Sequence, residues 1–132
     1  MIRQIDESMM VSGQLYPERL GDLGVAMVIN NRPDREEPGQ PSSAEIEAAA
    51  AAAGIAYHHI PIAGGFSDAQ VQEMQDALSA AEGPTLAFCK SGTRSIYLWA
   101  LARARMGDDA DALLAKGAAA GYDLTPIRGY LA

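Results

Sequence analysis

The sequence predicts a single α/β domain over residues 1–132, with a mostly parallel central sheet flanked by helices. Short, continuously apolar runs at 25–29 and 85–88 are typical of strands that are buried on both faces. Segments with helix caps and helical spacing lie between the apolar runs, and this alternation indicates crossover connections. The length suits one hydrophobic core, and no linker divides the chain.

The individual elements can be placed from apolar runs, helix caps and helix breakers. The expected elements are a strand at 9–12, a short helix at 18–23, a strand at 25–29, a helix from 42 or 43 to 54, a strand at 55–60, a helix capped by Ser67 or Asp68, a strand at 85–88, a helix at 95–106 and helical pieces near 109–116 and 122–130. A polar, proline-rich loop at 30–41 follows the second strand, where sites of α/β folds commonly form.

Composition and charge exclude several classes of protein. The formal net charge of -7 argues against a nucleic-acid partner, because a phosphate backbone attracts a basic face. No segment is apolar for long enough to cross a bilayer, and the first residues lack the apolar region of a signal peptide. The single cysteine allows no intramolecular disulfide. We therefore expect a cytoplasmic protein without a nucleic-acid or membrane partner.

No motif predicts a cofactor or a metal. His58 and His59 are adjacent in a predicted strand, so their side chains point to opposite faces and do not easily share a metal. With one cysteine elsewhere in the chain, no zinc pattern emerges.

Cys89 is the predicted catalytic residue, because it follows an apolar strand directly and precedes a helix. Gly92 lets the backbone curl, so that successive N–H groups can point to one spot in front of the positive helix end. Arg94 can pair with anionic oxygens through its guanidinium, and these effects together favour a nucleophilic thiolate. The predicted anion-binding positions are Lys90, Ser91, Gly92, Thr93 and Ser95. The alternative is an inert, buried cysteine.

A resemblance to a known family rests on five segments. They are Val-Ser-Gly-Gln at 11–14, Val-Ile-Asn-Asn-Arg-Pro-Asp at 28–34, Gln-Pro at 40–41, His-Ile-Pro-Ile at 59–62 and Cys-Lys-Ser-Gly-Thr-Arg-Ser at 89–95. Over about residues 9–115 the chain resembles the phosphatase-like domain of the β-lactamase-hydrolase-like proteins, also described as bacterial sulfur transferases. The resemblance implies a dual-specificity-phosphatase-like fold. It also implies a role in sulfide and persulfide metabolism and a functional link to a persulfide dioxygenase.

Two features favour sulfur transfer over phosphate hydrolysis. Four residues separate Cys89 from Arg94, one fewer than in tyrosine phosphatases, and single-domain rhodaneses resemble this chain in that spacing. The position that resembles the aspartic acid of such phosphatases is Gly64, while nearby Asp68 reads more simply as a helix cap. Without an acid, an alkoxide leaves slowly, whereas sulfite or a thiolate leaves unaided.

The expected activity is therefore that of a rhodanese-type sulfurtransferase. Cys89 would take the outer sulfur of thiosulfate or of a persulfide such as glutathione persulfide and pass it to a thiol acceptor. One alternative is a phosphatase that acts through a Cys89 phosphocysteine, and another is a non-enzymatic persulfide or oxyanion sensor. Arg32, Asp34 and Glu36, in the loop after a strand, are expected either to line the cleft or to form surface ion pairs.

Overall fold

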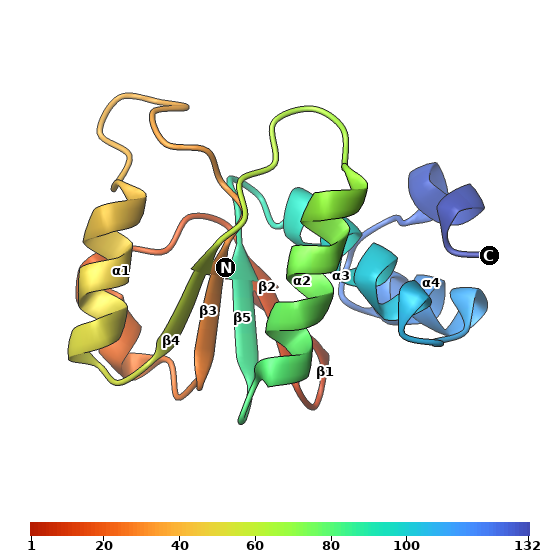
Figure 1. Cartoon of the computed structure of the whole chain (residues 1–132), viewed down its shortest axis with the longest axis horizontal. Coiled ribbons are helices and arrows are strands. Elements are labelled where there is room, and N and C mark those ends of the chain that lie inside the picture. Colours follow the sequence, from red (N-terminus) through yellow and green to blue (C-terminus); the bar gives the residue numbers. More distant parts are fainter.

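A five-stranded sheet forms the centre of the computed structural model, which describes residues 1–132 (Figure 1). The strands are β1 (Ile2–Asp6), β2 (Met9–Ser12), β3 (Met27–Asn30), β4 (Ala56–His59) and β5 (Thr85–Phe88), in the order β1-β2-β5-β3-β4. Strands β2, β5, β3 and β4 are parallel, and β1 pairs with β2 in the antiparallel direction. This is the predicted α/β architecture with a mostly parallel sheet.

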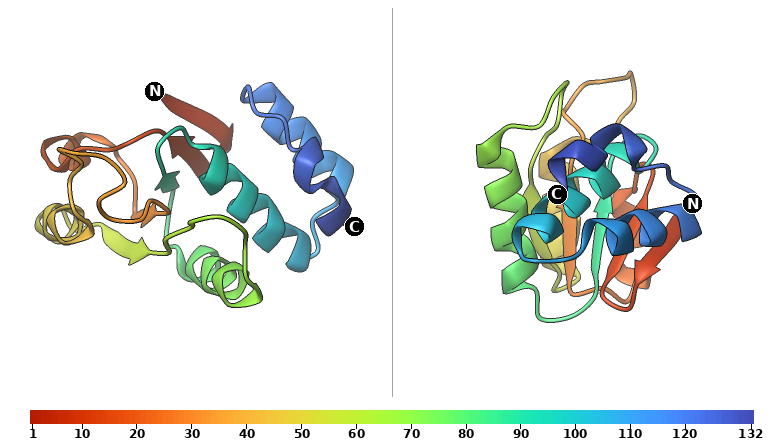
Figure 2. Two further views of the ribbon diagram at one scale, coloured as in Figure 1. Left: turned by 90° about the horizontal axis from the view of Figure 1, so that it is seen from above. Right: turned by 90° about the vertical axis from the view of Figure 1, so that its right-hand side faces the viewer.

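Helices cover both faces of the sheet. They are the 3₁₀ helices η1 (Pro17–Asp22) and η2 (Thr125–Tyr130) and the α-helices α1 (Ser43–Ala52), α2 (Asp68–Ala80), α3 (Thr93–Arg105) and α4 (Ala110–Ala119). Helices α1 and η1 pack together on one face, and α2 and α3 pack together on the other (Figures 1 and 2). Helix α4 extends the second layer, where it contacts α3 and β1. None of the helices has the length and apolar character needed to span a bilayer.

The central strands feed two separate hydrophobic clusters because alternate side chains of a strand point to opposite faces. In β3, Val28 packs with Ile46 of α1, whereas Met27 and Ile29 join the cluster beneath α2 and α3. All four residues of β3 and of β5 are buried. The continuous apolar runs in the sequence are therefore explained by burial on both faces of the sheet.

Two helices begin at the serines that the sequence suggests. Ser42 caps α1 and accepts a hydrogen bond from the Glu45 N–H, while the Glu45 side chain accepts from the Ser42 N–H. Ser67 and Gln70 form the same reciprocal arrangement at the start of α2. Asp68 is therefore the first helical residue of α2 and not its cap.

The structure departs from the expected elements at several places. Strand β1 was not expected, because only Ile5 of its five residues is buried and the pattern gives no strand signal. Helix α4 ends at Ala119, three residues later than expected, and the short helical segments form as the 3₁₀ helices η1 and η2. Strand β3 begins at Met27, two residues later than expected. Helix α3 begins at Thr93, two residues early, so its first turn includes Arg94.

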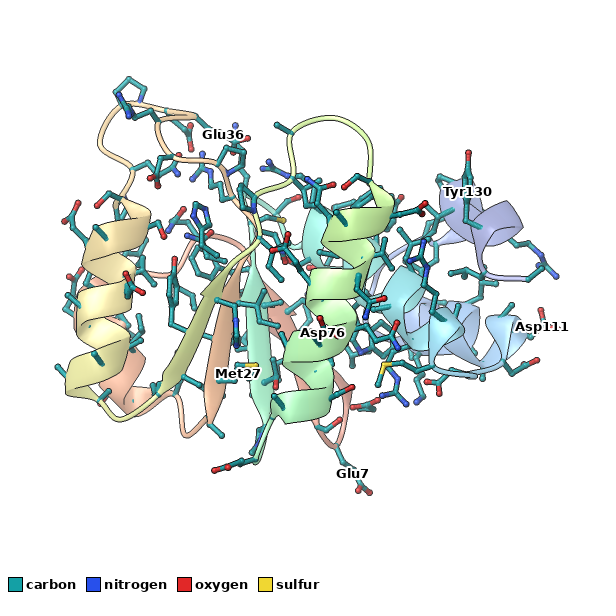
Figure 3. All side chains as sticks on the ribbon, in the orientation of Figure 1. Glu7, Met27, Glu36, Asp76, Asp111 and Tyr130 are labelled. Atoms are coloured by element: carbon teal, nitrogen blue, oxygen red, sulfur yellow. The ribbon has the colours of Figure 1, made fainter.

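The four parallel strands end at the same edge of the sheet, which is the upper edge in Figure 1. The loops that follow them begin at Gly13 after β2, Asn31 after β3, Ile60 after β4 and Cys89 after β5. Figure 3 shows Glu36 at this edge and Glu7, in the β1–β2 turn, at the opposite edge. Segments far apart in the sequence therefore meet around Cys89.

Candidate active site

Cys89 lies at the end of β5, directly before a tight turn into α3. Its Sγ accepts a hydrogen bond from the Gly92 N–H at 3.1 Å, and its own N–H donates to the Ser12 carbonyl at 3.3 Å. Gly92 has a φ of +92° and is the N-cap residue of α3, so the sulfur sits at the positive end of that helix. A hydrogen-bond donor and a helix N-terminus therefore both face the sulfur.

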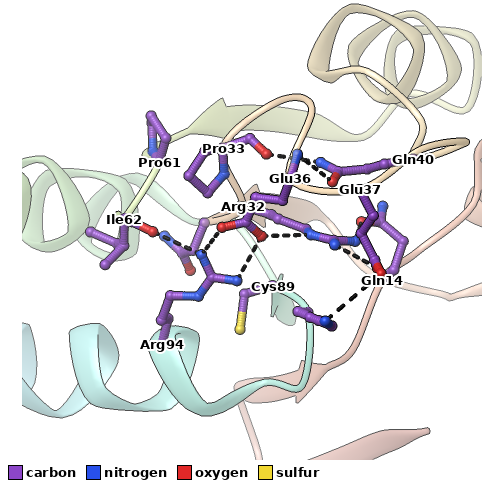
Figure 4. Close-up of polar contacts among 12 residues, drawn as sticks. Gln14, Arg32, Pro33, Glu36, Glu37, Gln40, Pro61, Ile62, Cys89 and Arg94 are labelled. Carbon is purple, nitrogen blue, oxygen red and sulfur yellow. Dashed lines mark hydrogen bonds and ion pairs between the residues drawn. The ribbon is translucent and has the colours of Figure 1, made fainter. Parts of the chain in front are cut away.

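Fewer backbone N–H groups reach the sulfur than expected. Among the N–H groups from Lys90 to Arg94, that of Gly92 lies within hydrogen-bonding distance of Sγ, while Thr93 and Arg94 are already helical. Cys89 is 1% exposed. The sulfur is nevertheless not isolated in the apolar interior, because the Arg94 guanidinium lies beside it (Figure 4).

Arg94 is held in place by two segments that are distant in sequence. Its Nη1 donates to Glu36 Oε2 at 2.7 Å and to the Ile62 carbonyl at 2.8 Å, and its Nη2 donates to Glu36 Oε1 at 2.9 Å (Figure 4). A guanidinium has five N–H donors, so these bonds leave the Nε–H and one Nη2–H, which lie along one side of the planar group. The hydrogen bonds with Glu36 raise the pKa of Arg94, and the Cys89 thiolate raises it further.

Glu36 lies between two arginines. Its Oε1 also accepts from Arg32 Nε at 2.8 Å, and the hydrogen bonds from Arg94 and then from Arg32 lower the pKa of Glu36 to about 2. Arg32 is 2% exposed and is further bound by Gln14 Oε1 at 2.9 Å and Glu37 Oε1 at 2.7 Å. Burial alone would lower the pKa of Arg32, but its carboxylate partners raise it above the ordinary value. Arg32 therefore forms ion pairs, but its side chain is buried and not on the surface.

Buried polar contacts connect α3 to the ends of β3 and β4. The Ser95 hydroxyl is fully buried and donates to Asn31 Oδ1 at 2.8 Å, and Asn31 Nδ2 donates to the Ile60 carbonyl at 3.0 Å. His59 Nε2 lies 2.9 Å from the Arg32 carbonyl oxygen. The Ser95 hydroxyl, which was predicted to help bind an anion, instead links the helix to the sheet.

Two glycines allow other parts of the chain to approach the cysteine loop closely. A Cβ at Gly13 would lie 2.8 Å from the Lys90 carbonyl oxygen, and a Cβ at Gly92 would lie 2.3 Å from Tyr122 Oη. The Tyr122 hydroxyl donates to the Ser91 carbonyl at 3.0 Å. Burial raises the pKa of Tyr122, which favours the protonated, donating form. A larger residue at either position would therefore collide with these neighbouring atoms.

The remaining predicted residues lie either on the cysteine loop or on other loops and helix ends. Lys90 is exposed and lies 3.7 Å from Glu37 Oε2, and the hydroxyls of Ser91 and Thr93 lie 3.1 Å apart on the same loop. Asp34 and Asp68 are engaged away from the sulfur: Asp34 accepts from the Ser43 N–H, and Asp68 pairs with Arg105. Gly64 lies in the loop after β4, with a φ of +101° and no side chain to contribute.

Sequence reasoning missed several residues that support the site. Glu36 was expected to line the cleft or to form an ion pair but was not matched with Arg94, and Glu37, Asn31 and Tyr122 were given no role. Glu36 contacts Arg94 across 58 positions of sequence, and Tyr122 contacts Ser91 across 31 positions. No local pattern indicates such pairs. The available signal for Asn31 and Arg32 was their place directly after a buried strand.

Comparisons with known proteins agree with this fold and motif. A family model described as "Beta-lactamase hydrolase-like protein, phosphatase-like domain" matches residues 1–106. The chain is 39% identical over 131 residues to the β-lactamase hydrolase-like protein of Xylella fastidiosa (strain Temecula1 / ATCC 700964), covering 93% of this chain and 30% of that protein. The chain belongs to this family. It spans less than a third of the length of the curated relatives that it matches.

Solved structures of phosphatase-like proteins share the fold. A candidate phosphatase from Neisseria meningitidis Z2491 superposes with a TM-score of 0.82 at 36% identity, over 98% of this chain and 95% of that chain. The core catalytic domain of a PP-IP phosphatase from S. cerevisiae superposes with a TM-score of 0.70 at 12% identity, over 98% and 82% of the two chains. The dual-specificity-phosphatase-like fold is confirmed. The family description and the Neisseria match support the phosphatase alternative better than the sulfurtransferase expectation.

Proposed function

We propose that this chain is a cysteine-dependent phosphatase. The observation that carries the proposal is the grouping of Cys89 with the free side of the Arg94 guanidinium at the N-terminus of α3. Two N–H groups of Arg94 remain to bind the oxygens of a phosphoryl group, and the helix end stabilises the added negative charge. Membership of a family with a phosphatase-like domain supports this reading.

The reaction has two steps. The Cys89 thiolate forms an S–P bond with a phosphate monoester while the O–P bond breaks, and the leaving oxygen takes a proton from solvent after it has departed. Water then attacks the phosphocysteine, giving inorganic phosphate and restoring the thiolate. The proposed setting is the cytoplasm, where a lone thiol stays reduced.

The test compares the chain with a variant that lacks only the nucleophile. The purified protein should release phosphate from p-nitrophenyl phosphate, and Cys89→Ser should release none. A phosphocysteine trapped by rapid acid quench and found by mass spectrometry would place the phosphoryl group on Cys89. Phosphate release by Cys89→Ser at the rate of the parent would contradict the proposal.

Sulfur transfer remains a second proposal because of one observation. Only four residues separate Cys89 from Arg94, and the turn is so tight that the Gly92 N–H bonds the sulfur. A terminal sulfur on Cys89 needs less room than a phosphoryl group with three equatorial oxygens. The proposed partners are a sulfane-sulfur donor such as thiosulfate or glutathione persulfide, a thiol acceptor and a functionally linked persulfide dioxygenase.

The two proposals predict different covalent products. After exposure to thiosulfate, a sulfurtransferase gains the mass of one sulfur at Cys89 and passes that sulfur to an added thiol. A gain of sulfur together with no hydrolysis of p-nitrophenyl phosphate would reverse the order of the two proposals.

A further inference from the structure

The carboxyl groups near Cys89 that could donate a proton to a leaving group are engaged elsewhere. The loop after β4 contains Gly64 and Gly65, which have no side chain that could act as an acid. Asp68 is the carboxylate that lies nearest in sequence to these two glycines. Its side chain is 96% exposed and pairs with Arg105. That loop therefore places no acid at the sulfur.

Glu36 contacts the anion-binding arginine but is held in its ionised form. Both of its oxygens accept hydrogen bonds from Arg94, and Oε1 also accepts from Arg32. Such charge-assisted bonds stabilise the carboxylate and leave it without a proton to give at neutral pH. Glu36 therefore orients Arg94 and does not serve as an acid.

Several other polar groups around the loop are also hydrogen-bonded to neighbouring atoms. Glu37 accepts from Arg32 and lies near Lys90, while the Tyr122 hydroxyl donates its hydrogen to the Ser91 carbonyl. The His59 ring faces the carbonyl oxygen of Arg32, which can only accept, so Nε2 donates its hydrogen there. The Ser95 hydroxyl donates to Asn31. None of these hydrogens is directed at a group bound to Cys89.

We infer that the enzyme acts on substrates whose leaving group departs without being protonated: phosphoanhydrides, acyl phosphates and electron-poor aryl phosphates. This inference rests on the proposed phosphatase function and narrows its substrate class. The bond to phosphorus breaks with both electrons on the leaving oxygen, and a weakly basic oxygen carries that charge without an acid. Simple alkyl phosphates, whose alkoxides are strongly basic, are poor substrates for such a site.

The experiment measures kcat/KM for aryl phosphates that differ only in the acidity of their phenol. From p-nitrophenyl phosphate to phenyl phosphate we expect a fall of about 10²–10³, because a missing acid typically costs 10²–10⁴. Acetyl phosphate should be turned over, and glycerol phosphate should not. Equal rates for the two aryl phosphates would overturn the inference while leaving the phosphatase function standing.

Glu36→Gln separates the two roles of that carboxyl. We expect the ratio of rates for p-nitrophenyl and phenyl phosphate to stay the same in Glu36→Gln, although both rates fall because Arg94 loses its partner. A ratio that grows by about tenfold or more would identify Glu36 as the acid and overturn the inference. Release of phosphate from no substrate in the series would instead contradict the proposed function itself, and the inference with it.

Discussion

At the scale of single residues, the direction in which Arg94 presents its donors is the central feature of the site. Glu36 and the Ile62 carbonyl take three of its five N–H groups, and these contacts fix the plane of the guanidinium. The two remaining donors face the region beside Cys89. The charge of Arg94 therefore matters less than its planar geometry, which a lysine cannot reproduce.

Arg94→Lys tests this geometric role. The variant keeps the positive charge but loses the paired donors, so we expect kcat/KM on p-nitrophenyl phosphate to fall by about 10²–10³. Steady-state kinetics provide the measurement, and circular dichroism verifies that the variant folds. A folded Arg94→Lys enzyme with nearly full activity would show that the paired donors of the guanidinium are not required.

The Glu36 carboxylate also links stability to pH. The pKa of Glu36 is lowered to about 2 from an ordinary value of 4.5, first by its hydrogen bonds with Arg94. Because the folded pKa is depressed, the stabilisation is complete above about pH 4.5 and is lost as the pH falls towards about 2. The free-energy difference between the parent and Glu36→Gln should thus be constant near neutrality and shrink in acid.

Urea unfolding at neutral, mildly acidic and strongly acidic pH measures this difference. Asp111→Asn provides a control, because the Asp111 side chain is 78% exposed and its pairing with Arg128 is a surface contact of little energy. A Glu36→Gln difference that grows on acidification would contradict the assigned sign.

At the scale of elements, the turn between β5 and α3 depends on the close approach of a distant segment. Gly92 has a φ of +92°, and Tyr122, which follows α4, lies where a side chain at this position would go. The same tyrosine donates to the Ser91 carbonyl. The C-terminal part of the chain therefore helps to hold the cysteine loop in its tight form.

Gly92→Ala should destabilise the protein and impair the site together. A left-handed conformation for a non-glycine residue costs about 1–3 kcal/mol, and the new Cβ would lie 2.3 Å from Tyr122 Oη. We expect a lower urea midpoint and a loss of activity larger than the loss of folded protein explains. Unchanged activity and stability would mean that the turn is not constrained in this way.

A second variant separates the contact from the backbone strain. Tyr122→Phe removes the hydroxyl that the alanine would strike, so Gly92→Ala combined with Tyr122→Phe should recover part of the lost stability. Full recovery is not expected, because the φ of residue 92 still disfavours alanine. A double-mutant cycle measures the coupling. If the two losses simply add, the contact between these residues is not responsible.

At the scale of the whole molecule, one sheet couples two hydrophobic clusters. Ile46 of α1 belongs to the cluster on one face, and Trp99 of α3 belongs to the cluster on the other. The buried strands β3 and β5 contribute alternate side chains to both clusters. Unfolding of one face therefore exposes the strands that the other face needs, which favours a single cooperative transition.

Ile46→Ala tests this coupling. Removal of a fully buried isoleucine should cost about 2–5 kcal/mol, and Trp99 fluorescence and circular dichroism should report the same, lower urea midpoint. Tyr130→Ala is the matched control and should change stability by less than about 0.5 kcal/mol, because Tyr130 is 78% exposed. Two separate midpoints in Ile46→Ala would show that the clusters unfold independently.

Local signals in the sequence were sufficient for most of the fold. The apolar runs before Asn30 and Cys89, the serines before α1 and α2, and the glycine after Cys89 are short-range features whose effects act within a few residues. Strand β1 was not predicted, because its residues are mostly exposed and the strand is held by pairing with β2. Helix caps and helix-breaking residues also did not indicate that η1 and η2 are 3₁₀ helices.

The sequence by itself determined the α/β fold, the family resemblance and the cysteine loop with its arginine. Only the tertiary structure decided which way Arg94 faces, that Glu36 is pinned between two arginines and that Tyr122 packs over Gly92. The physical reason is range: turns and caps depend on neighbouring residues, whereas these contacts join segments that meet only when parallel strands end at one edge of a sheet.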